Sequence, residues 1–347
     1  ALNSLLGHLL IQIIFFRYTI YMPYKIFSNS SKTWDAMIES IDNAQESIYI
    51  EMYAFLDDNT THDFIGKIRK KSEQGVQVII IADFLGSSEI QNASIEILRT
   101  SGAEFIFFNQ WLTRIHRKVL IIDRKIAFIG GVNIGENFKH WNDLQLKIRN
   151  QHLVRSIIRS FANTYRIVGG KNHSILKLGR QTLPKKLKSW MLHHWPGANK
   201  RNHLKNLYIK KISKAKKSIL ITTPYFAPPL WLTRLLKIAV FHGITVEIII
   251  PRKTDFFLAD QINYFFMKRL HKSKIKFLLF PKMNHAKSLL IDDSEFLIGS
   301  QNLDILSFYV NPELSIFSKD KKLVQNFLRI IRSWKKIAVP FKDSSHK

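Results

Sequence analysis

One stretch of eight residues occurs twice in this chain and decides how the rest of it is interpreted. The first copy is His116-Arg-Lys-Val-Leu-Ile-Ile-Asp123 and the second is His285-Ala-Lys-Ser-Leu-Leu-Ile-Asp292, 169 residues later. Seventeen residues after each histidine comes an asparagine, Asn133 or Asn302, at the end of a small-residue segment. A single copy would suit an ordinary strand with a surface histidine and lysine. Two copies with the same spacing indicate a functional motif.

Three further pairs of segments repeat in the same order at nearly the same offset, so the chain is interpreted as an internal duplication. This predicts an apolar N-terminal segment at residues 1–27, a first half at 28–165, a basic linker at 166–199 and a second half at 200–340. The repeated pairs are Ile48–Phe55 with Ile219–Phe226, Gly75–Asp83 with Gly243–Pro251, and Ala103–Asn109 with Ile275–Pro281.

Each half alternates strand-like and helix-like segments. The β-branched runs 76–81 and 246–250 are typical of buried parallel strands. The stretches 61–74 and 230–242 are expected to be helices, since each is followed by a glycine. Late in each half, two close strands suggest an antiparallel hairpin. The predicted fold class is α/β, with two duplicated α/β sandwich halves whose central sheets are mostly parallel.

The charge of the chain points to a polyanionic partner. Lys and Arg number 53 against 26 Asp and Glu, a formal net charge of +27. Nucleic acid and an anionic membrane surface both fit such a charge. The chain has no cysteine, which excludes disulfides, thiol catalysis and cysteine-ligated metal sites.

The basic residues are concentrated in the middle of the chain. No acidic residue lies between Asp143 and Glu247, while 21 of the 53 Lys and Arg do. This stretch is either a solvated linker or a surface that docks on anionic lipid, with interfacial tryptophans beside the cations. The candidate membrane-binding residues are Lys185, Lys186, Trp190 and Trp195. The adjacent His193 and His194 lack metal-ligand partners and are expected to be surface or linker residues.

The N-terminus is a second candidate membrane element. Residues 1–16 carry no formal charge, and Arg17 then interrupts the apolar run. The run is shorter than the ~20 residues of a spanning helix unless the arginine snorkels. A membrane-associated helix, a helix packed on the protein and a remnant of a signal peptide all remain open.

The residue types of the motif suit phosphate chemistry. Residues two apart on a strand share a face, so His116 and Lys118 point the same way, as do His285 and Lys287. The glycine-containing turns bring Asn133 and Asn302 back toward these residues. A histidine, a lysine cation and an amide donor together can handle a phosphodiester.

Four acidic residues complete the candidate site, two that can orient the histidines and two that end the motif strands. Asp143 and Glu313 lie 27 and 28 residues past the histidines of their own halves. A carboxylate there can accept the second imidazole N–H and select its tautomer. Asp123 and Asp292 end their strands and are expected to support the hairpins. A separate apolar loop, 223–231, follows a strand and is expected either to contact acyl chains or to pack against the other half.

The doubled His-x-Lys-x4-Asp motif resembles the signature of the phospholipase D superfamily, and the chain looks most like bacterial cardiolipin synthases. The resemblance covers residues ~30–335 and is highly specific. One departure is Leu306, where many members carry arginine, and this affects substrate preference more than the central chemistry. The matching stretches are 116–118, 130–135, 141–143, 223–226, 299–304 and 311–313.

The resemblance implies an active site between the halves and a double displacement at phosphorus. It suggests His116 as the nucleophile that forms a phosphohistidine and His285 as the acid, with Asp143 and Glu313 orienting them. Lys118, Lys287, Asn133 and Asn302 would hold the non-bridging oxygens, and no metal or other cofactor is implied. The near-symmetry of the halves leaves the roles of the two histidines open.

The predicted function is that of a membrane-associated phosphatidyltransferase. Family behaviour implies phosphatidylglycerol as donor, a second phospholipid as acceptor, an anionic phospholipid membrane as partner, and the bacterial inner membrane as location. A phospholipase D that uses water is the first alternative. A nuclease or phosphodiesterase of the same superfamily is the second, since a basic face also binds a nucleic-acid backbone. Oligomeric state is open, because one chain supplies both half-sites.

Overall fold

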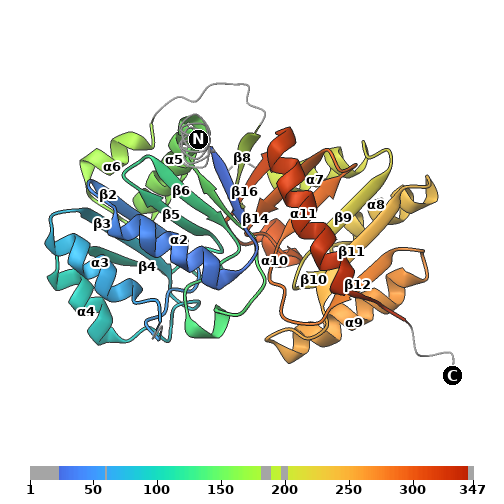
Figure 1. Ribbon diagram of the computed structural model, residues 1–347, viewed down its shortest axis with the longest axis horizontal. Helices are drawn as coiled ribbons and strands as arrows, with labels where there is room; N and C mark the ends of the chain where they lie inside the picture. Colours follow the sequence, from blue (N-terminus) through green and yellow to red (C-terminus); the bar gives the residue numbers. More distant parts are fainter. Residues whose placement is uncertain (1–22, 59–60, 181–188, 197–201, 343–347) are drawn as a thin grey trace, which may run out of the picture.

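The computed structural model describes residues 23–58, 61–180, 189–196 and 202–342. Two α/β units lie side by side, the first drawn in blue to green and the second in yellow to red (Figure 1). The expected N-terminal membrane segment falls largely on residues 1–22, and Lys185 and Lys186 fall on 181–188. These expectations lie outside the described residues. Among the described residues, no helix has the length and apolar character needed to cross a bilayer.

The first half is a seven-stranded sheet covered by helices on both faces. Its strand order is β1-β7-β6-β5-β2-β3-β4. Its elements are β1 (Tyr24–Phe27), α2 (Ser30–Asp42), β2 (Ser47–Met52), α3 (Phe64–Glu73), β3 (Gln77–Asp83), α4 (Asn92–Thr100), β4 (Glu104–Phe108), β5 (Lys118–Ile122), β6 (Ile126–Gly130), the 3-10 helix η1 (Glu136–Phe138), β7 (Gln145–Ile148), α5 (Gln151–Ile167) and α6 (His173–Leu178).

The second half repeats this arrangement in an eight-stranded sheet. Its order is β17-β12-β11-β9-β13-β14-β16-β8, beside a separate two-stranded pair of β10 and β15. Its elements are β8 (Ser189–His194), α7 (His203–Ile212), β9 (Ser218–Thr222), β10 (Phe226–Ala227), α8 (Leu230–Phe241), β11 (Thr245–Pro251), α9 (Phe257–His271), β12 (Lys276–Phe280), β13 (Ser288–Ile291), β14 (Glu295–Gly299), β15 (Leu303–Asp304), α10 (Ile305–Tyr309), β16 (Glu313–Ser318), α11 (Lys321–Ile337) and β17 (Val339–Pro340).

The two sheets share one strand order through six positions. The order β7-β6-β5-β2-β3-β4 in the first half corresponds to β16-β14-β13-β9-β11-β12 in the second. The predicted strands at 76–81 and 246–250 are confirmed as β3 and β11. The predicted helices at 61–74 and 230–242 are confirmed as α3 and α8. Both expected hairpins are present, since β5 pairs antiparallel with β6 and β13 with β14.

The sheets are mixed rather than mostly parallel. Parallel pairing is limited to β2-β3-β4 in the first half and β9-β11-β12 in the second. The remaining neighbours are antiparallel, apart from the separate β10–β15 pair. The physical reason lies in the connections. Helices provide the long crossovers that parallel strands need, whereas the short turn at Asp123 or Asp292 forces the chain to reverse.

Alternation along the strands divides each sheet between two cores. Ile48 and Ile50 of β2 face α2 and α3, while Tyr49 faces the opposite side and stacks on Phe161 of α5. The core on this second side also contains residues of the other half, including Phe327 of α11. Apolar burial therefore holds the two halves against each other.

Two boundaries differ from the prediction. Residues 24–27, expected within the N-terminal segment, form β1 and pair with β7. The predicted linker 166–199 contains α6 and β8, and β8 pairs along its whole length with β16 of the second sheet. In this strand Ser189, Leu192 and His194 are buried. Leu192 and His194 lie on one face of the strand and Ser189 on the other, so both faces of this edge strand are partly covered, and the high lysine content around it obscures the strand in the sequence.

Candidate active site

The two histidines of the repeated motif lie directly before the middle strands of the two sheets. His116 precedes β5 and His285 precedes β13, and only 8% and 4% of their surfaces are exposed. A short backbone bridge joins the halves at this point. The N–H of His285 donates to the carbonyl of Asn142 at 2.7 Å, and the N–H of Asn142 donates to the carbonyl of Met283 at 3.1 Å. The segment that carries Asp143 is thereby held beside the segment that carries His285.

Each histidine is paired with the carboxylate of the other half. The Nδ1 of His285 lies 2.8 Å from Oδ2 of Asp143, and the Nδ1 of His116 lies 3.2 Å from Oε1 of Glu313. An ionised carboxylate accepts, so Nδ1 carries the hydrogen and Nε2 is left as the reactive nitrogen. The sequence spacing places each carboxylate after the histidine of its own half, and the crossing appears only when the halves assemble.

The carboxylates are themselves held from behind. Glu313 accepts hydrogen bonds from the hydroxyls of Ser300 and Ser307, the latter at 2.7 Å. Asp143 accepts the N–H of Leu144 at 2.6 Å. A side chain at Gly131 would collide with the Asp143 carboxylate, so glycine is required there for close approach. Sequence reasoning missed Ser300 and Ser307 as functional residues. Ser300 occupies the position that Gly131 has in the first half. This difference between the two turns was the only feature of the repeat that could have indicated a role for Ser300.

The two lysines lie on the same strand faces as the histidines before them. The ammonium of Lys118 donates to the carbonyl of His116 at 2.8 Å, and that of Lys287 donates to the carbonyl of His285. The side chains of Asn133 and Asn302 are buried, and their amide oxygens have no hydrogen-bond partner among the described residues. An unpaired buried amide oxygen is costly, so each of these oxygens is a candidate to accept a hydrogen bond from a ligand hydroxyl.

Burial and mutual repulsion set the protonation of the site. Burial, aided by the repulsion of Lys287, lowers the pKa of Lys118 well below its usual value, and burial lowers the pKa of Lys287 to about 8. Burial and the neighbouring lysine lower the pKa of His285 to about 4, and the same two causes lower the pKa of His116. Although burial opposes it, the paired histidine and nearby lysine hold the pKa of Asp143 below its usual range. The pKa of Glu313 is lowered in the same way.

Aromatic rings border the histidines. The ring of Tyr53 lies edge-on to His116 with centroids 5.0 Å apart, and the ammonium of Lys118 lies 4.8 Å from the Tyr53 ring. On the other side, Trp141 and Tyr225 approach His285 with centroids at 5.2 and 6.2 Å. Sequence reasoning missed the roles of these rings, although both tyrosines lie within the first pair of repeated segments.

A buried charged cluster lies behind the first catalytic strand. Arg117, between His116 and Lys118, is fully buried and its Nη1 lies 3.1 Å from Oε1 of Glu51. It also donates to the hydroxyls of α5 residues Ser160 and Thr164 and lies 2.9 Å from Nε2 of His193 on β8. The second half has Ala286 and Thr222 at the positions of Arg117 and Glu51.

This cluster corrects the expectation that His193 and His194 are surface residues. His193 is held against Arg117, where burial and that positive charge lower its pKa to about 2. His194 is buried, with its Nε2 3.1 Å from the carbonyl oxygen of Phe308. Of the expected membrane-binding tryptophans, Trp195 lies over the Arg117 guanidinium at 5.1 Å and Trp190 packs on Phe317. Both are half-buried in protein contacts.

Asp123 and Asp292 occupy equivalent turns. Each adopts a positive φ of about 50° at the end of its strand. The Asp123 carboxylate accepts the N–H groups of residues 45–47, and the Asp292 carboxylate accepts those of 216–218. Each carboxylate thus ties the hairpin to the start of the neighbouring strand, β2 or β9, at a distance from the histidines. These contacts favour the predicted supporting role.

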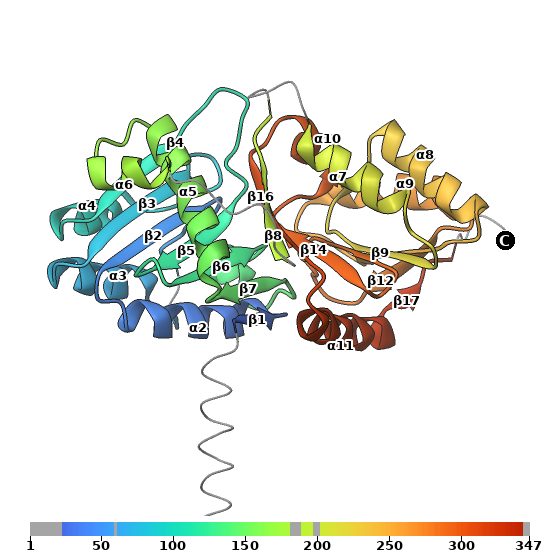
Figure 2. The same ribbon diagram turned by 90° about the horizontal axis from the view of Figure 1, so that it is seen from above.

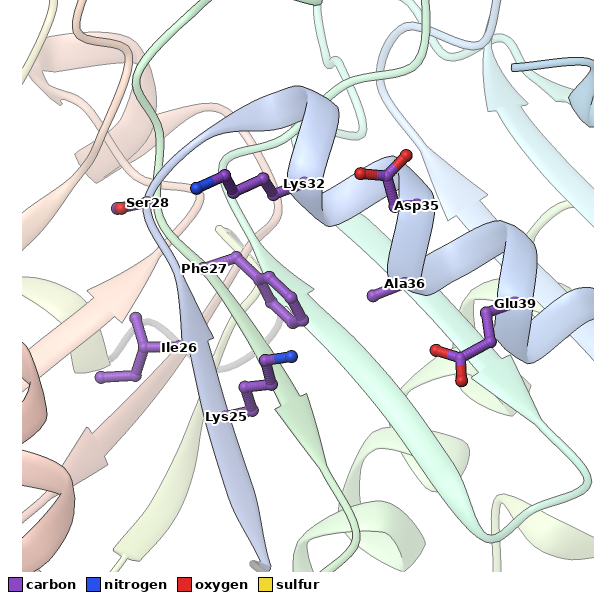
Figure 3. A pocket seen from close by; sticks show the side chains of 8 residues that line it. All are labelled: Lys25, Ile26, Phe27, Ser28, Lys32, Asp35, Ala36 and Glu39. Atoms are coloured by element: carbon purple, nitrogen blue, oxygen red, sulfur yellow. The ribbon is translucent and has the colours of Figure 1, made fainter. Parts of the chain in front are cut away.

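An open groove of about 590 Å³ lies behind the site between β1 and α2 (Figure 3). It is lined by cationic, acidic and aromatic side chains, and the ammonium of Lys25 lies 4.8 Å from the Phe27 ring. Neither histidine lines it. Its Ser28 carbonyl accepts the N–H of Asp143 at 3.4 Å, so the groove adjoins the back of the Asp143 segment. Within the described parts of the chain, no group of three or more histidine and acidic side chains is placed to hold a metal ion.

Two imidazoles oriented by carboxylates, two lysines and two free amides from related halves define a phosphodiester-transferring site of the phospholipase D type. Known proteins agree with this class. A family model described as "Cardiolipin synthase, PLD-like domain" matches residues 37–165 and 208–334. The chain belongs to this family of the phospholipase D superfamily, and it is a phosphodiester transferase.

Similar proteins include cardiolipin synthases of two bacteria. The one from Clostridium perfringens is 29% identical over 93% of this chain and 73% of that protein. A probable cardiolipin synthase of Bacillus subtilis is 27% identical over 87% of this chain and 63% of that protein. Among solved structures, the phosphatidylserine synthase of Haemophilus influenzae matches with a TM-score of 0.76 at 17% identity. It covers 93% of this chain and 88% of that one, which shows a shared fold.

Removing one member of the buried Glu51–Arg117 pair is expected to be strongly destabilising. Glu51→Ala leaves a buried guanidinium without its counter-charge and should cost about 3–5 kcal/mol of unfolding free energy. Replacing both partners, Glu51→Leu with Arg117→Met, should recover most of that loss. Urea unfolding followed by circular dichroism measures both effects.

The second half offers the matched control. Thr222→Val removes the hydrogen bond to Ser288 at the equivalent sheet position and should cost only about 1 kcal/mol, because it leaves no buried charge. A Glu51→Ala loss no larger than that of Thr222→Val would show that the ion pair does not hold this strand.

Proposed function

We propose that this chain transfers a phosphatidyl group from phosphatidylglycerol to the hydroxyl of a second phospholipid, producing cardiolipin and glycerol. The observation that carries the proposal is the convergence of two Nδ1-anchored imidazoles with Lys118 and Lys287. Similarity to cardiolipin synthases supports the choice of lipid.

The first step is attack on the phosphorus of the donor by one imidazole Nε2. We assign this role to His116, so that an N–P bond forms and the P–O bond to the glycerol headgroup breaks. His285 gives its proton to the departing glycerol oxygen. In the second step His285 takes the proton of the incoming lipid hydroxyl, whose oxygen forms the new P–O bond as the N–P bond breaks.

The surrounding groups stabilise the charge that moves through these steps. Lys118 and Lys287 oppose the negative charge on the non-bridging oxygens, and the side-chain NH2 groups of Asn133 and Asn302 are the donors for the same oxygens. A bound phosphodiester carries one negative charge, which offsets the repulsion between the lysines. Substrate binding should therefore raise the pKa of the lysines and of His285, giving His285 the proton that the acid role requires.

Lipid mass spectrometry on phosphatidylglycerol vesicles tests the proposal. The purified chain should produce cardiolipin and glycerol, and His116→Ala and His285→Ala should each reduce the rate by at least about a thousandfold. The matched control is His152→Ala, which removes an exposed histidine outside the site and should leave the rate unchanged.

Other products would assign a different reaction. Phosphatidic acid in place of cardiolipin would make water the acceptor and the chain a phospholipase D. Absence of lipid turnover together with cleavage of DNA under matched conditions would contradict the proposal and favour a nuclease.

The pH dependence follows from the lysine beside His285. Because the pKa of Lys287 in the free protein is about 8, its charge is lost above that pH. For a soluble short-chain phosphatidylglycerol, kcat/KM should therefore fall by up to about tenfold per pH unit on the alkaline side. Lys287→Arg keeps its charge and should move the part of this limb that belongs to Lys287 upward, although its different shape should lower the maximum. The part that belongs to Lys118, whose pKa is also lowered, should remain. Lys216→Arg at an exposed site is the control. If Lys287→Arg leaves the alkaline limb at the same pH, the limb belongs to a group other than Lys287.

A further inference from the structure

Large apolar side chains are exposed around the active site instead of being buried. We define the rim as Phe84, Trp111, Leu112, Phe257, Leu258 and Leu306. Trp111 is 89% exposed, Leu112 70%, Phe257 71% and Leu306 56%. Scattered single hydrophobic residues are common on protein surfaces, but a group of this size at one place marks an interaction surface.

In the first half, the rim residues adjoin groups that hold the His116 segment. Phe84 follows Asp83, whose carboxylate accepts the N–H of Ile115 at 2.8 Å. Trp111 and Leu112 lie in the connection between β4 and β5, where the N–H of Arg114 donates to the side chain of Asn311 of the other half at 3.2 Å. The apolar residues of this half therefore stand next to the segment that leads into the catalytic strand.

In the second half, the rim residues adjoin groups that contact His285 and Glu313. Phe257 comes two residues after Asp255, which accepts the hydroxyl of Tyr225 at 2.6 Å. Leu306 precedes Ser307, whose hydroxyl donates to Glu313. The rim thus borders the site from both halves. Figure 2 shows α9, α10 and the β4–β5 connection on the side of the molecule opposite α2 and α11.

Helix α9 extends the apolar surface beyond the rim. Its residues Leu258, Ile262 and Phe265 follow the four- and three-residue spacing of one helix face, and all three are exposed. The opposite face is also apolar, with Met267 and Leu270 buried against the sheet. A helix that is apolar on both faces at a protein surface needs a second partner for its outer face.

The partner of this apolar surface must carry negative charge and must leave the active site accessible. Exposed cations flank the aromatic segment at Arg252, Lys253 and Lys282. The histidines are nearly buried, so a second copy of this chain seated on the rim would close the access to His116 and His285. A bilayer offers an anionic surface with apolar material below it, and its phosphodiesters lie at that boundary.

We propose that the rim docks the active site on an anionic phospholipid bilayer, with Trp111, Phe257 and Leu306 inserted at the level of the headgroups and upper acyl chains. This inference rests on the proposed function for the identity of the substrate. The docking surface is distinct from the predicted one at Trp190 and Trp195, whose side chains pack on Phe317 and Arg117.

The absence of cysteine from the chain makes a direct test possible. Trp111→Cys and Leu306→Cys, each carrying an environment-sensitive fluorophore, are mixed with phosphatidylglycerol vesicles whose acyl chains are brominated. The emission should shift to shorter wavelength and lose at least about half its intensity by quenching. The control is Arg332→Cys on the exposed face of α11, which should show neither effect.

Four results would overturn the docking surface. The first is that the protein binds the vesicles while the emission of the rim labels stays that of a water-exposed fluorophore. The second is that the protein does not bind the vesicles. The third is a spectral shift without vesicles that grows with protein concentration, which would make a second copy the partner. A shift with single-stranded DNA in place of vesicles would likewise assign the rim to nucleic acid.

A kinetic comparison separates this inference from the proposed function. Trp111→Ser with Phe257→Ser should lower the rate on vesicles by about ten- to a hundredfold, because two aromatic anchors are lost. The rate on monomeric short-chain phosphatidylglycerol should be unchanged. Equal loss on both substrates would contradict docking. Absence of wild-type turnover on either lipid would defeat the proposed function, while the fluorescence experiment would still decide the docking surface.

Discussion

The crossed pairing of histidines and carboxylates is the constraint on which the rest of the structure depends. Asp143 of the first half holds His285 of the second, and Glu313 of the second holds His116 of the first. Neither half alone can present an imidazole with its tautomer selected by a carboxylate. The site therefore exists only where both halves meet, and the shared apolar core and the bridge between Asn142 and Asn284 serve to keep them there.

The electrostatics follow from the same arrangement. Bringing two lysines and two histidines into a nearly buried space disfavours their charged forms, and the crossed carboxylates compensate only in part. An anionic phosphodiester supplies the missing negative charge, so the resting site is complementary to its substrate. The cluster of Arg117, Glu51 and His193 adds a second link, since it ties the His116 strand to β8 and through β8 to the strand of Glu313.

Much of the fold and the site was predictable because the same spacing occurs in both halves, whereas a single copy would not differ from an ordinary strand. The doubled spacing identified His116, Lys118, His285 and Lys287 and predicted their shared strand faces. Alternation and glycine positions predicted α3, α8 and the hairpins. The crossing of the carboxylates was not predictable, because a spacing within one half says nothing about which half a side chain faces after assembly.

Other features depended on tertiary contacts that a local pattern does not encode. Strand β8 is interrupted by polar residues and surrounded by lysines, yet it completes the second sheet at the edge of β16. Trp195 is a tryptophan in a lysine-rich stretch, as in a membrane anchor, but its ring covers the buried guanidinium of Arg117. The exposed apolar surface lies instead on the loops after β3 and β4 and on helices α9 and α10, where sequence alone does not distinguish a buried from an exposed aromatic residue.

The most direct test of the crossed site is the imidazole Nδ1–H resonance of each histidine, measured by proton NMR with nitrogen-labelled histidine. A proton shared with a carboxylate gives a strongly downfield signal, and His116→Gln and His285→Gln assign the two signals. The structure predicts that Asp143→Asn removes the His285 signal and leaves that of His116, and that Glu313→Gln does the reverse. Loss of the signal from the histidine in the same half as the substituted carboxylate would contradict it.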